Sequence, residues 1–455
     1  MKKKLLLALP VVVGVTGASW AGSTYYSSNE SRTAYERILS DFTDTTGLAF
    51  ITTSYAPGFL QSEAITEIRM SEEPDAKLIA RLRHNIEHSP EGSGAATGIS
   101  ATRVITTFIT DDASQELLDA FDGKAPVTLL SSVGFNGTVS NQLTIAAFKG
   151  ETPDGVALKS DGGFWNFDID ENGSVAGTGT WSGFNFSSPD VNITISPSQD
   201  SFNYTRHGPA VYSGGYELNL SEIVVNSPLS GINVGARDLG LNTGTELKNG
   251  SLNSDYKLWV SDIDAPIALD SAALSSSVGG IDISNLKDAR DFLMQAQFTD
   301  VDALDESAVD TLVVDYLKIY GDLIQPGAFL SYAVELGNAG GEAEADIKLT
   351  FEGDGSPTGY DLLASPNATL ADLVTALRVD VNMEASNDAL ALTPAAAIVD
   401  SVPLSPWVVD DSVNLKSDIV LDDMLINANG ETIALEMMFG DVLYQPLNLD
   451  KLLSM

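Results

Sequence analysis

The feature that most constrains the fold is a series of short runs of alternating polar and apolar residues, from about residue 51 to residue 266. Alternation with a period of two is typical of strands that bury one face. Asn-Gly pairs separate several of these runs, at Asn136-Gly137, Asn172-Gly173 and Asn249-Gly250. Asn and Gly tolerate the positive φ of a type I′ turn, so each pair predicts a hairpin. The pattern therefore predicts an antiparallel sheet with one solvated side.

The clearest hairpin of this region pairs Phe164–Ile169 with Val175–Phe186. Further strands are expected at Ala328–Leu336, Ala343–Phe351 and Leu377–Ala385. A closing hairpin is expected between Ile419–Ile426 and Thr432–Phe439, joined by Asn429-Gly430. These segments extend the expected sheet to the C-terminal part of the chain.

Helical periodicity separates some of the expected strands. Helices are predicted at Thr33–Phe42, at Leu286–Phe298 and at Asp305–Ile324, where Asp305 can cap the first turn. Thr369 and Asp372 are spaced as a capping box for a further short helix.

The fold class expected is α+β and β-rich: long antiparallel sheets with hairpins and a few packed amphipathic helices, after an N-terminal membrane or signal segment. We expect residues 1–29 to form that segment and residues 30–285 a β-rich part of the ectodomain. Residues 286–455 are expected to form a mixed helix and strand part, with one continuous domain as the alternative.

The N-terminus predicts export. Lys2, Lys3 and Lys4 precede an apolar core from Leu5 to Val15, and no charged residue follows until Glu30. Cleavage after Ala21 would release a soluble periplasmic or secreted protein, whereas an uncleaved segment would anchor it in the inner membrane. Both readings place the body outside the cytoplasm.

The balance of charge narrows the choice of partners. The chain of 455 residues holds 63 acidic against 24 basic residues, a formal net charge of −39. Such a field repels the phosphates of nucleic acids, so no nucleic-acid partner is expected. Carboxylates spread along the chain are typical of proteins that stay soluble in salty surroundings, which predicts a salt-adapted source.

Few residues point to catalysis or to a cofactor. The chain has no cysteine and three histidines. His207-Gly208-Pro209 could present a general base, but no nucleophile elbow, zinc motif or phosphate loop accompanies it. Asp168, Asp170 and Asn172-Gly173 match the start of a calcium loop, yet its twelfth position is Gly179 where a Glu is required. We therefore expect no cofactor, no metal and no enzymatic activity.

A cluster of basic residues stands out from Lys77 to His88. Read as a strand, it puts Leu82, His84 and Ile86 on a core face and the arginines at 81 and 83 on a solvent face. The arginines are expected to pair with neighbouring acids, with an anion or partner site as the alternative.

Short motifs make the chain resemble a known family. Tyr55-Ala56-Pro57-Gly58-Phe59, followed by Ser62, is similar to a Tyr-x-x-Gly-aromatic stretch followed by Ser in the bacterial envelope proteins of domain of unknown function 945, also called YdgA-like. The next family motif, a strand ending in His-Gly-Pro, corresponds to His88-Ser89-Pro90, with Ser in place of Gly.

The resemblance implies a periplasmic protein of a Gram-negative bacterium, held by an uncleaved inner-membrane anchor. It supplies no established activity and no catalytic residues. The matching positions are interpreted as determinants of the fold, because glycine allows a tight turn and the aromatic side chains fill a core. These positions are Tyr55, Gly58, Phe59, Ser62, His88 and Pro90.

The function expected from the sequence is a structural or accessory role in the cell envelope, without enzymatic activity. The first alternative is a binding protein or carrier for an apolar envelope molecule such as a lipid. A periplasmic hydrolase is the second alternative. Expected partners are the membrane, through the N-terminal segment, and a lipid or another envelope protein.

Overall fold

The computed structural model describes residues 39, 43, 48–58, 61–71, 73, 76–87, 102–109, 119–133, 138–151, 155–208, 211–265, 269–298, 311–312, 315, 318–319, 321, 323–353, 369–392, 405–411 and 413–445. The chain divides into two compact units. Unit 1 comprises Met1–Gly231 and Arg290–Asp300, and unit 2 comprises Ile232–Ala289 and Val301–Met455.

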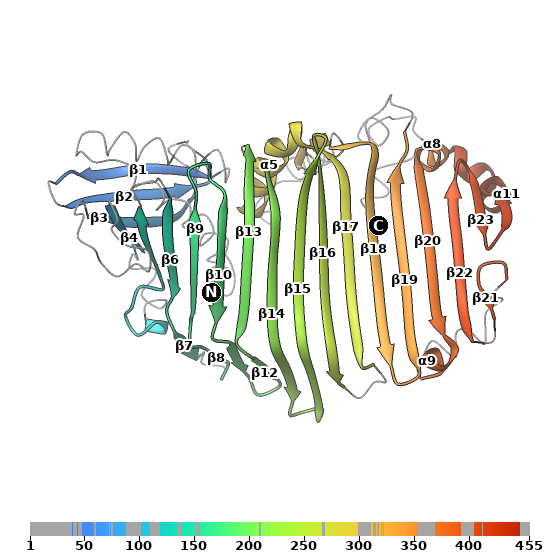
Figure 1. The fold of residues 1–455 in the computed structure, drawn as a ribbon, viewed down its shortest axis with the longest axis horizontal. Helices are drawn as coiled ribbons and strands as arrows, with labels where there is room; N and C mark the ends of the chain where they lie inside the picture. The colour runs from blue at the N-terminus through green and yellow to red at the C-terminus, as the bar shows by residue number, and fades with distance from the viewer. Residues whose placement is uncertain are drawn as a thin grey trace. The chain divides into compact units, whose positions relative to one another are not determined.

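Unit 1 is built on an antiparallel sheet in which β1 to β6 pair in chain order, and β6 is followed across the sheet by β9, β10, β13 and β14 (Figure 1). The shorter strands β7, β8, β11 and β12 pair with one another in that order, and β12 pairs with β14. Its strands are β1 (Ala49–Ala56), β2 (Gln61–Arg69), β3 (Leu78–Glu87), β4 (Thr102–Phe108), β5 (Val127–Val133), β6 (Val139–Ile145), β7 (Phe148–Glu151), β8 (Ala157–Ser160), β9 (Gly163–Ile169), β10 (Val175–Trp181), β11 (Phe184–Ser187), β12 (Asn192–Ile195), β13 (Ser198–Gly208) and β14 (Val211–Ser227).

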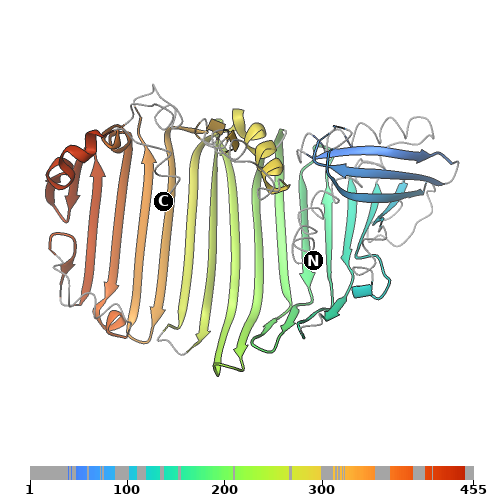
Figure 2. The same cartoon turned by 180° about the vertical axis from the view of Figure 1, so that it is seen from behind.

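Unit 2 is also antiparallel, and its strands β15 to β20 run side by side in chain order (Figure 2). Strand β20 then pairs with β22, which also pairs with β21 and β23, and β23 pairs with β24. Its strands are β15 (Ile232–Lys248), β16 (Ser251–Asp264), β17 (Ser271–Asp282), β18 (Ile324–Asn338), β19 (Gly341–Phe351), β20 (Leu377–Ser386), β21 (Val409–Asp410), β22 (Asn414–Asp422), β23 (Leu425–Ala428) and β24 (Glu431–Ala434). The prediction of long antiparallel sheet is confirmed.

The described helices are short and lie between strands or after the last one. They are the 3₁₀ helix η3 (Ile283–Asn285), α5 (Leu286–Phe298), α8 (Leu370–Thr375), α9 (Asn387–Ala391), α11 (Leu435–Phe439) and the 3₁₀ helix η5 (Gly440–Tyr444). The bounds of α5 match the expectation, and the Thr369–Asp372 capping box at α8 is present. Most of the helix expected at 305–324 lies outside the described residues.

The core of unit 1 shows that its sheet folds back on itself. Phe50, Ile68 and Leu82, from β1 to β3, belong to the same buried cluster as Val139 of β6 and Phe167 of β9. Leu39, at a helical position within the predicted 33–42 helix, is also buried in this cluster. Burial of these side chains is the main force that closes unit 1, because it removes a large apolar area from water.

Four strands that are neighbours across the sheet of unit 1 all break along one line. Each of the strands β6, β9, β10 and β13 is separated by a two-residue break in the chain from a shorter strand, β7, β8, β11 and β12 respectively. The residues that flank the breaks are neighbours across the sheet. Gly162 and Gly183 occupy two of the breaks with φ of 90° and 93°. Only glycine adopts this backbone at low cost. A hollow of about 360 Å³ opens beside this line.

The turns agree only in part with the predicted type. Asn249-Gly250 and Asn429-Gly430 have positive φ at both residues, as a type I′ turn requires. At Asn172-Gly173 only the glycine has positive φ, 83°, and its N–H donates to the carbonyl of Asp170. This hairpin therefore uses a longer loop ending in a left-handed glycine. Asn136-Gly137 lies outside the described residues.

The closing hairpin is shorter than predicted. Asp423 and Met424 have positive φ and end β22, so the expected strand 419–426 is two strands, β22 and β23. Strand β23 then pairs with β24, and residues 435–439 form α11 instead of continuing the strand. The pair Asp423-Met424 lacks the glycine of a typical left-handed turn pair such as Asn-Gly, so nothing in the sequence predicted a break within this strand.

Among the residues that the structure describes, no helix is long and apolar enough to cross a membrane. The predicted signal or anchor segment, residues 1–29, lies outside that part of the chain.

Candidate functional site

The strand register of unit 2 places apolar side chains in rows on one face of its sheet. Residues paired across antiparallel strands point to the same face, so each row can be read from the pairing. The central row is Leu241, Leu258, Leu274, Val334, Ala345, Met383 and Ser417. Its neighbours are Thr243, Tyr256, Ser276, Tyr332, Ile347, Val381 and Ile419 on one side, and Leu239, Val260, Ala272, Leu336, Ala343, Ala385 and Leu415 on the other. We call these three rows the apolar face.

The apolar face contains no charged residue in any of its three rows, although the chain holds 63 acids. It spans seven strands, β15–β20 and β22, or about 29 Å at 4.8 Å per strand. Contiguous apolar surface of this kind on an acidic protein indicates an interaction site.

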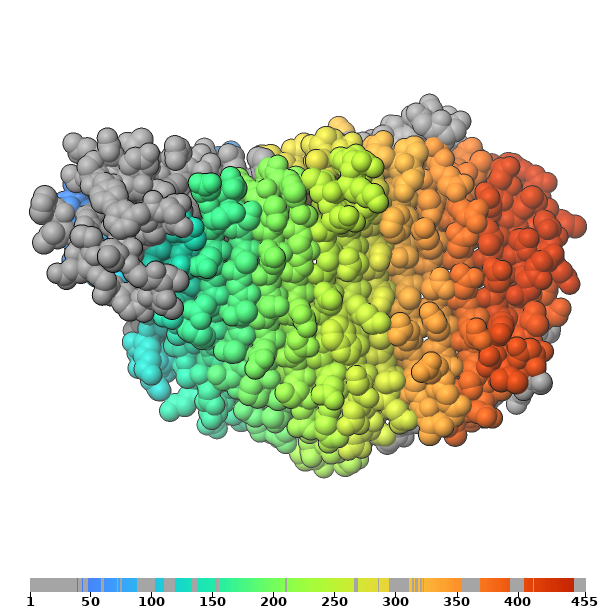
Figure 3. Space-filling model, in the orientation of Figure 1, coloured from blue at the N-terminus to red at the C-terminus, as the bar shows by residue number. Residues whose placement is uncertain are grey.

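Large side chains of the apolar face are open to solvent. The exposed fraction lies between 38% and 47% for Leu258, Leu274, Tyr332, Val334, Leu336, Ile347 and Met383. In the space-filling view, the strands of unit 2 pack against one another into a continuous surface (Figure 3). The core of unit 1, by contrast, buries its large apolar residues almost completely.

The opposite face of the same sheet is charged. Lys257 forms an ion pair with Glu335 at 3.3 Å, and Lys416 pairs with Glu384 at 3.2 Å. Hydrogen bonds from the Lys416 side chain to both Glu384 and Asp411 raise its pKa. The sheet therefore presents one hydrated side and one side that water solvates poorly.

A hollow of about 260 Å³ deepens one edge of the apolar face. Its lining includes Ala343, Ala345 and Ala385 from β19 and β20, and Leu390 of α9 and Val408 lie against it. The methyl side chains of the alanines leave space where neighbouring positions carry Leu, Val or Met. This hollow is the concave apolar element that a ligand site requires.

The described histidines do not form a catalytic arrangement with the apolar face. His84 is fully buried in unit 1, and its ring nitrogens lie 2.9 Å from Thr106 Oγ1 and 3.1 Å from Thr66 Oγ1. Burial lowers the pKa of His84 to about 3, so the ring is neutral near neutral pH. His207 is exposed and lies 2.7 Å from Ser213 Oγ. His88 lies outside the described residues.

The basic strand has the two faces predicted for it. Leu82, His84 and Ile86 are buried, while Arg81 and Arg83 project from the other side. Arg83 pairs with Glu63 at 3.1 Å.

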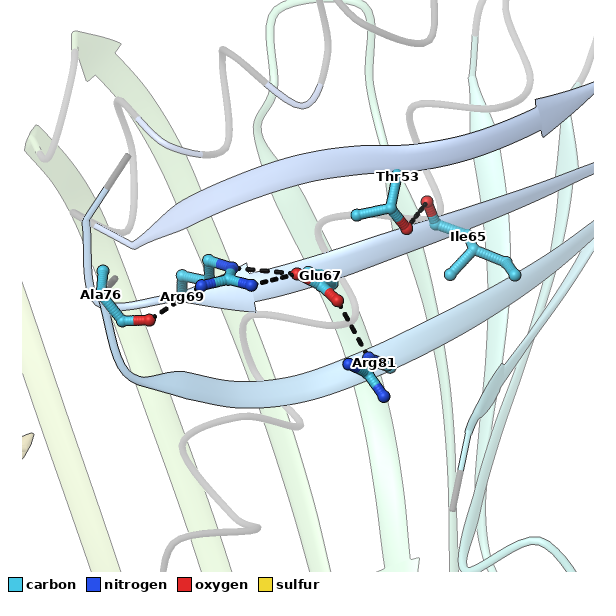
Figure 4. A network of polar contacts seen from close by, with 6 residues as sticks. All are labelled: Thr53, Ile65, Glu67, Arg69, Ala76 and Arg81. Atoms are coloured by element: carbon cyan, nitrogen blue, oxygen red, sulfur yellow. Dashed lines mark hydrogen bonds and ion pairs between the residues drawn. The ribbon is translucent and has the colours of Figure 1, made fainter. Parts of the chain in front are cut away.

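The carboxylate of Glu67 joins two further arginines of this sheet (Figure 4). It accepts from Arg69 at 2.6 Å and from Arg81 at 2.9 Å, and these bonds lower the pKa of Glu67. Ion pairs with neighbouring acids thus account for Arg69, Arg81 and Arg83.

The described family-motif residues shape the turn between β1 and β2. The N–H of Gly58 donates to Ser62 Oγ at 3.2 Å, and Ser62 is buried. A Cβ at Gly58 would overlap the carbonyl oxygen of Gln61, so the turn requires glycine. Tyr55 packs against the core of unit 1. Phe59, His88 and Pro90 lie outside the described residues.

In the segment that matches the start of a calcium loop, the carboxylate of Asp170 stabilises a turn. Asp170 Oδ1 accepts from the backbone N–H groups of Asn172 and Ser174, each at 2.9 Å. The part of the chain that is described contains no group of three acidic, histidine or cysteine residues placed to hold a metal ion.

Comparison with protein-family models matches residues 1–402 to the family described as bacterial protein of unknown function (DUF945). The resemblance seen in the sequence motifs is thereby confirmed. A search of curated proteins finds no match.

Proposed function

Because this chain belongs to the DUF945 family of bacterial proteins, whose function is unknown, we propose its role from its own geometry. It binds an acyl-chain lipid of the cell envelope on the apolar face of unit 2 and acts as a carrier or holder for it, without catalysis. The observation that carries the proposal is the uncharged face seven strands wide, whose large apolar side chains on β16 to β20 are exposed.

A hydrocarbon chain fits this face better than a hydrated ligand does. The backbone groups of strands β16 to β20 are paired with one another, so they leave the side chains to define the surface. An acyl chain gains roughly 0.8 kcal/mol for each methylene that it buries, and it loses no hydrogen bond. We therefore propose lipid binding as the function, in place of the structural role expected from the sequence.

The charge of the molecule favours some lipids over others. With a net charge of −39, the protein repels anionic headgroups at low salt. Zwitterionic and uncharged lipids avoid that repulsion, so we expect them to be the preferred ligands.

The proposed location is the periplasm, with the body outside the inner membrane. The support is Lys2, Lys3 and Lys4 ahead of the apolar core Leu5–Val15. Intact mass of the protein from its own membrane checks the anchor. A chain that retains Met1 is expected, and a species beginning at Gly22 would show cleavage after Ala21 instead.

Mass spectrometry of small molecules released after gentle purification from the native envelope tests the binding function. We expect a near-stoichiometric lipid above an empty-purification control. The Tyr332→Asp variant puts a charge on the apolar face and should lose the lipid, because a buried carboxylate next to an acyl chain is costly.

Ser331→Asp is the matched control, because Ser331 lies one residue away on the charged face, between Ser277 and Lys348. It should retain the lipid. Wild-type protein that releases nothing above the empty control would contradict the proposal, as would equal retention by the two variants.

A further inference from the structure

The hollow at the edge of the apolar face has a floor made by alanines. Ala343 of β19 is paired with Ala385 of β20, and Ala345 lies two residues further along the same face. The next positions in these rows are larger: Leu336 opposes Ala343, and Met383 opposes Ala345. The recess therefore results from three small side chains surrounded by long ones.

The lining of the hollow offers a ligand no free hydrogen-bonding side chain among its described residues. Its one hydroxyl, Ser417 Oγ, donates to the carbonyl of Trp407 at 2.6 Å. Lys416 and Glu344 also border the hollow, but their strand positions are on the charged face, where Lys416 pairs with Glu384. A peptide backbone or polar headgroup placed here would lose its hydrogen bonds to water without replacement.

The size of the hollow limits the occupant further. Its volume of about 260 Å³ is below the range of roughly 300–1,000 Å³ typical of sites that enclose a drug-sized molecule. Val334, Leu336 and Met383 line the hollow and are also part of the exposed apolar face. A long ligand can therefore end in the hollow while the rest of it lies on the open face.

We infer that the hollow receives the methyl end of a single acyl chain and limits the chain length that the protein prefers. This inference rests on the proposed lipid-binding function. Leu390 and Val408, which lie outside the three rows of the apolar face, also line the hollow, so apolar side chains from beyond the sheet rows contact the chain end. A large residue at the floor should leave short chains unaffected and exclude the last carbons of long ones.

The test measures binding of uncharged 1-monoacylglycerols of increasing chain length to the full-length protein by calorimetry. For the wild type, affinity should rise about fourfold per added methylene until the hollow is full. Ala385→Leu fills the floor, so its affinity should stop rising at a shorter chain. Met383→Ala enlarges the hollow and should shift the limit to a longer chain.

The matched control is Ala333→Leu, which makes the same change on the charged face of β18, opposite Asp346. Its length profile should equal that of the wild type, and melting curves confirm that each variant is folded. If Ala385→Leu and Met383→Ala both keep the wild-type limit while the wild type binds, the inference is wrong and the binding function stands. If the wild type binds no monoacylglycerol of any length, both fail.

Discussion

At the scale of single residues, a glycine in a strand of unit 1 leaves space for a large side chain of the neighbouring strand. Trp165 lies over Gly179 on the adjacent strand, and its indole N–H donates to Asp200 Oδ2 at 2.8 Å. A Cβ at Gly179 would overlap both the indole ring and the Asp200 carboxylate. The small residue is therefore needed for the contact between β9 and β13.

Gly179→Ala should accordingly destabilise the protein by about 1–3 kcal/mol, because it overpacks this site. Chemical denaturation followed by tryptophan fluorescence measures the change. Gly150→Ala is the control, since Gly150 also lies in a strand of unit 1 but has open space around its Cβ position. An equal loss in the two variants would show that the Trp165 packing is unimportant.

The buried His84 predicts a pH dependence of stability. Its pKa is about 3 in the folded protein and about 6.5 in an unfolded chain. Between these values the unfolded state binds one more proton, so the free energy of unfolding falls as the pH is lowered.

His84→Gln should remove up to about 1.4 kcal/mol per pH unit from this slope between pH 6 and pH 4. Denaturant midpoints across that range give the slope. Asn85→Gln is the control, because Asn85 lies next to His84 in β3 and has no titratable side chain, and it should leave the slope unchanged. The expectation about His84 fails if its variant keeps the wild-type slope.

At the scale of elements, the line of strand breaks in unit 1 depends on backbone that few residues adopt. Gly183 has φ of 93°, and an added Cβ would lie 2.5 Å from the carbonyl oxygen of Ile195. Ser160 supports the same break, because its hydroxyl donates to the carbonyl of Gly183 at 2.7 Å. Trp181 Nε1 in turn donates to Ser160 Oγ at 2.9 Å.

Gly183→Ala should therefore lower the free energy of unfolding by more than the roughly 1–2 kcal/mol that a left-handed backbone alone costs a residue with a Cβ. Gly123→Ala separates the two effects, because Gly123 has φ of 73° and nothing near its Cβ position. Differential scanning calorimetry should rank Gly183→Ala well below Gly123→Ala in melting temperature. Equal melting temperatures would show that the backbone shifts at no cost to relieve the contact between the added Cβ and the carbonyl oxygen of Ile195.

At the scale of the whole molecule, charge dominates the response to solvent. The chain has 39 more acidic than basic residues, so its carboxylates outnumber the basic side chains that could pair with them by more than two to one. Their repulsion is screened over about 10 Å at 0.1 M salt and about 3 Å at 1 M. A surface of this kind is stabilised by salt.

The melting temperature should rise by several degrees between low-salt buffer and about 1 M NaCl, as the Debye length shortens. Sodium sulfate at matched ionic strength is less informative, because it also strengthens apolar burial. A melting temperature that does not fall on dialysis into low salt would argue against salt adaptation.

The sequence by itself determined the class of fold and many of its elements. Alternation and Asn-Gly pairs predicted the antiparallel hairpins, and the spacing of Thr369 and Asp372 predicted the cap of α8. These features depend on residues close in the chain, whose backbone preferences act locally. The family, too, was recognisable from the short motif around Tyr55 and Gly58.

Only the tertiary structure decided where the alternating residues meet. Leu274, Val334 and Met383 are far apart in the sequence, and the strand register puts them in one row. A shift of one residue in any strand would have moved its apolar side chains to the charged face. The alanine-floored hollow likewise exists because Ala343 pairs with Ala385, a contact set by the cooperative packing of the sheet and by no local signal.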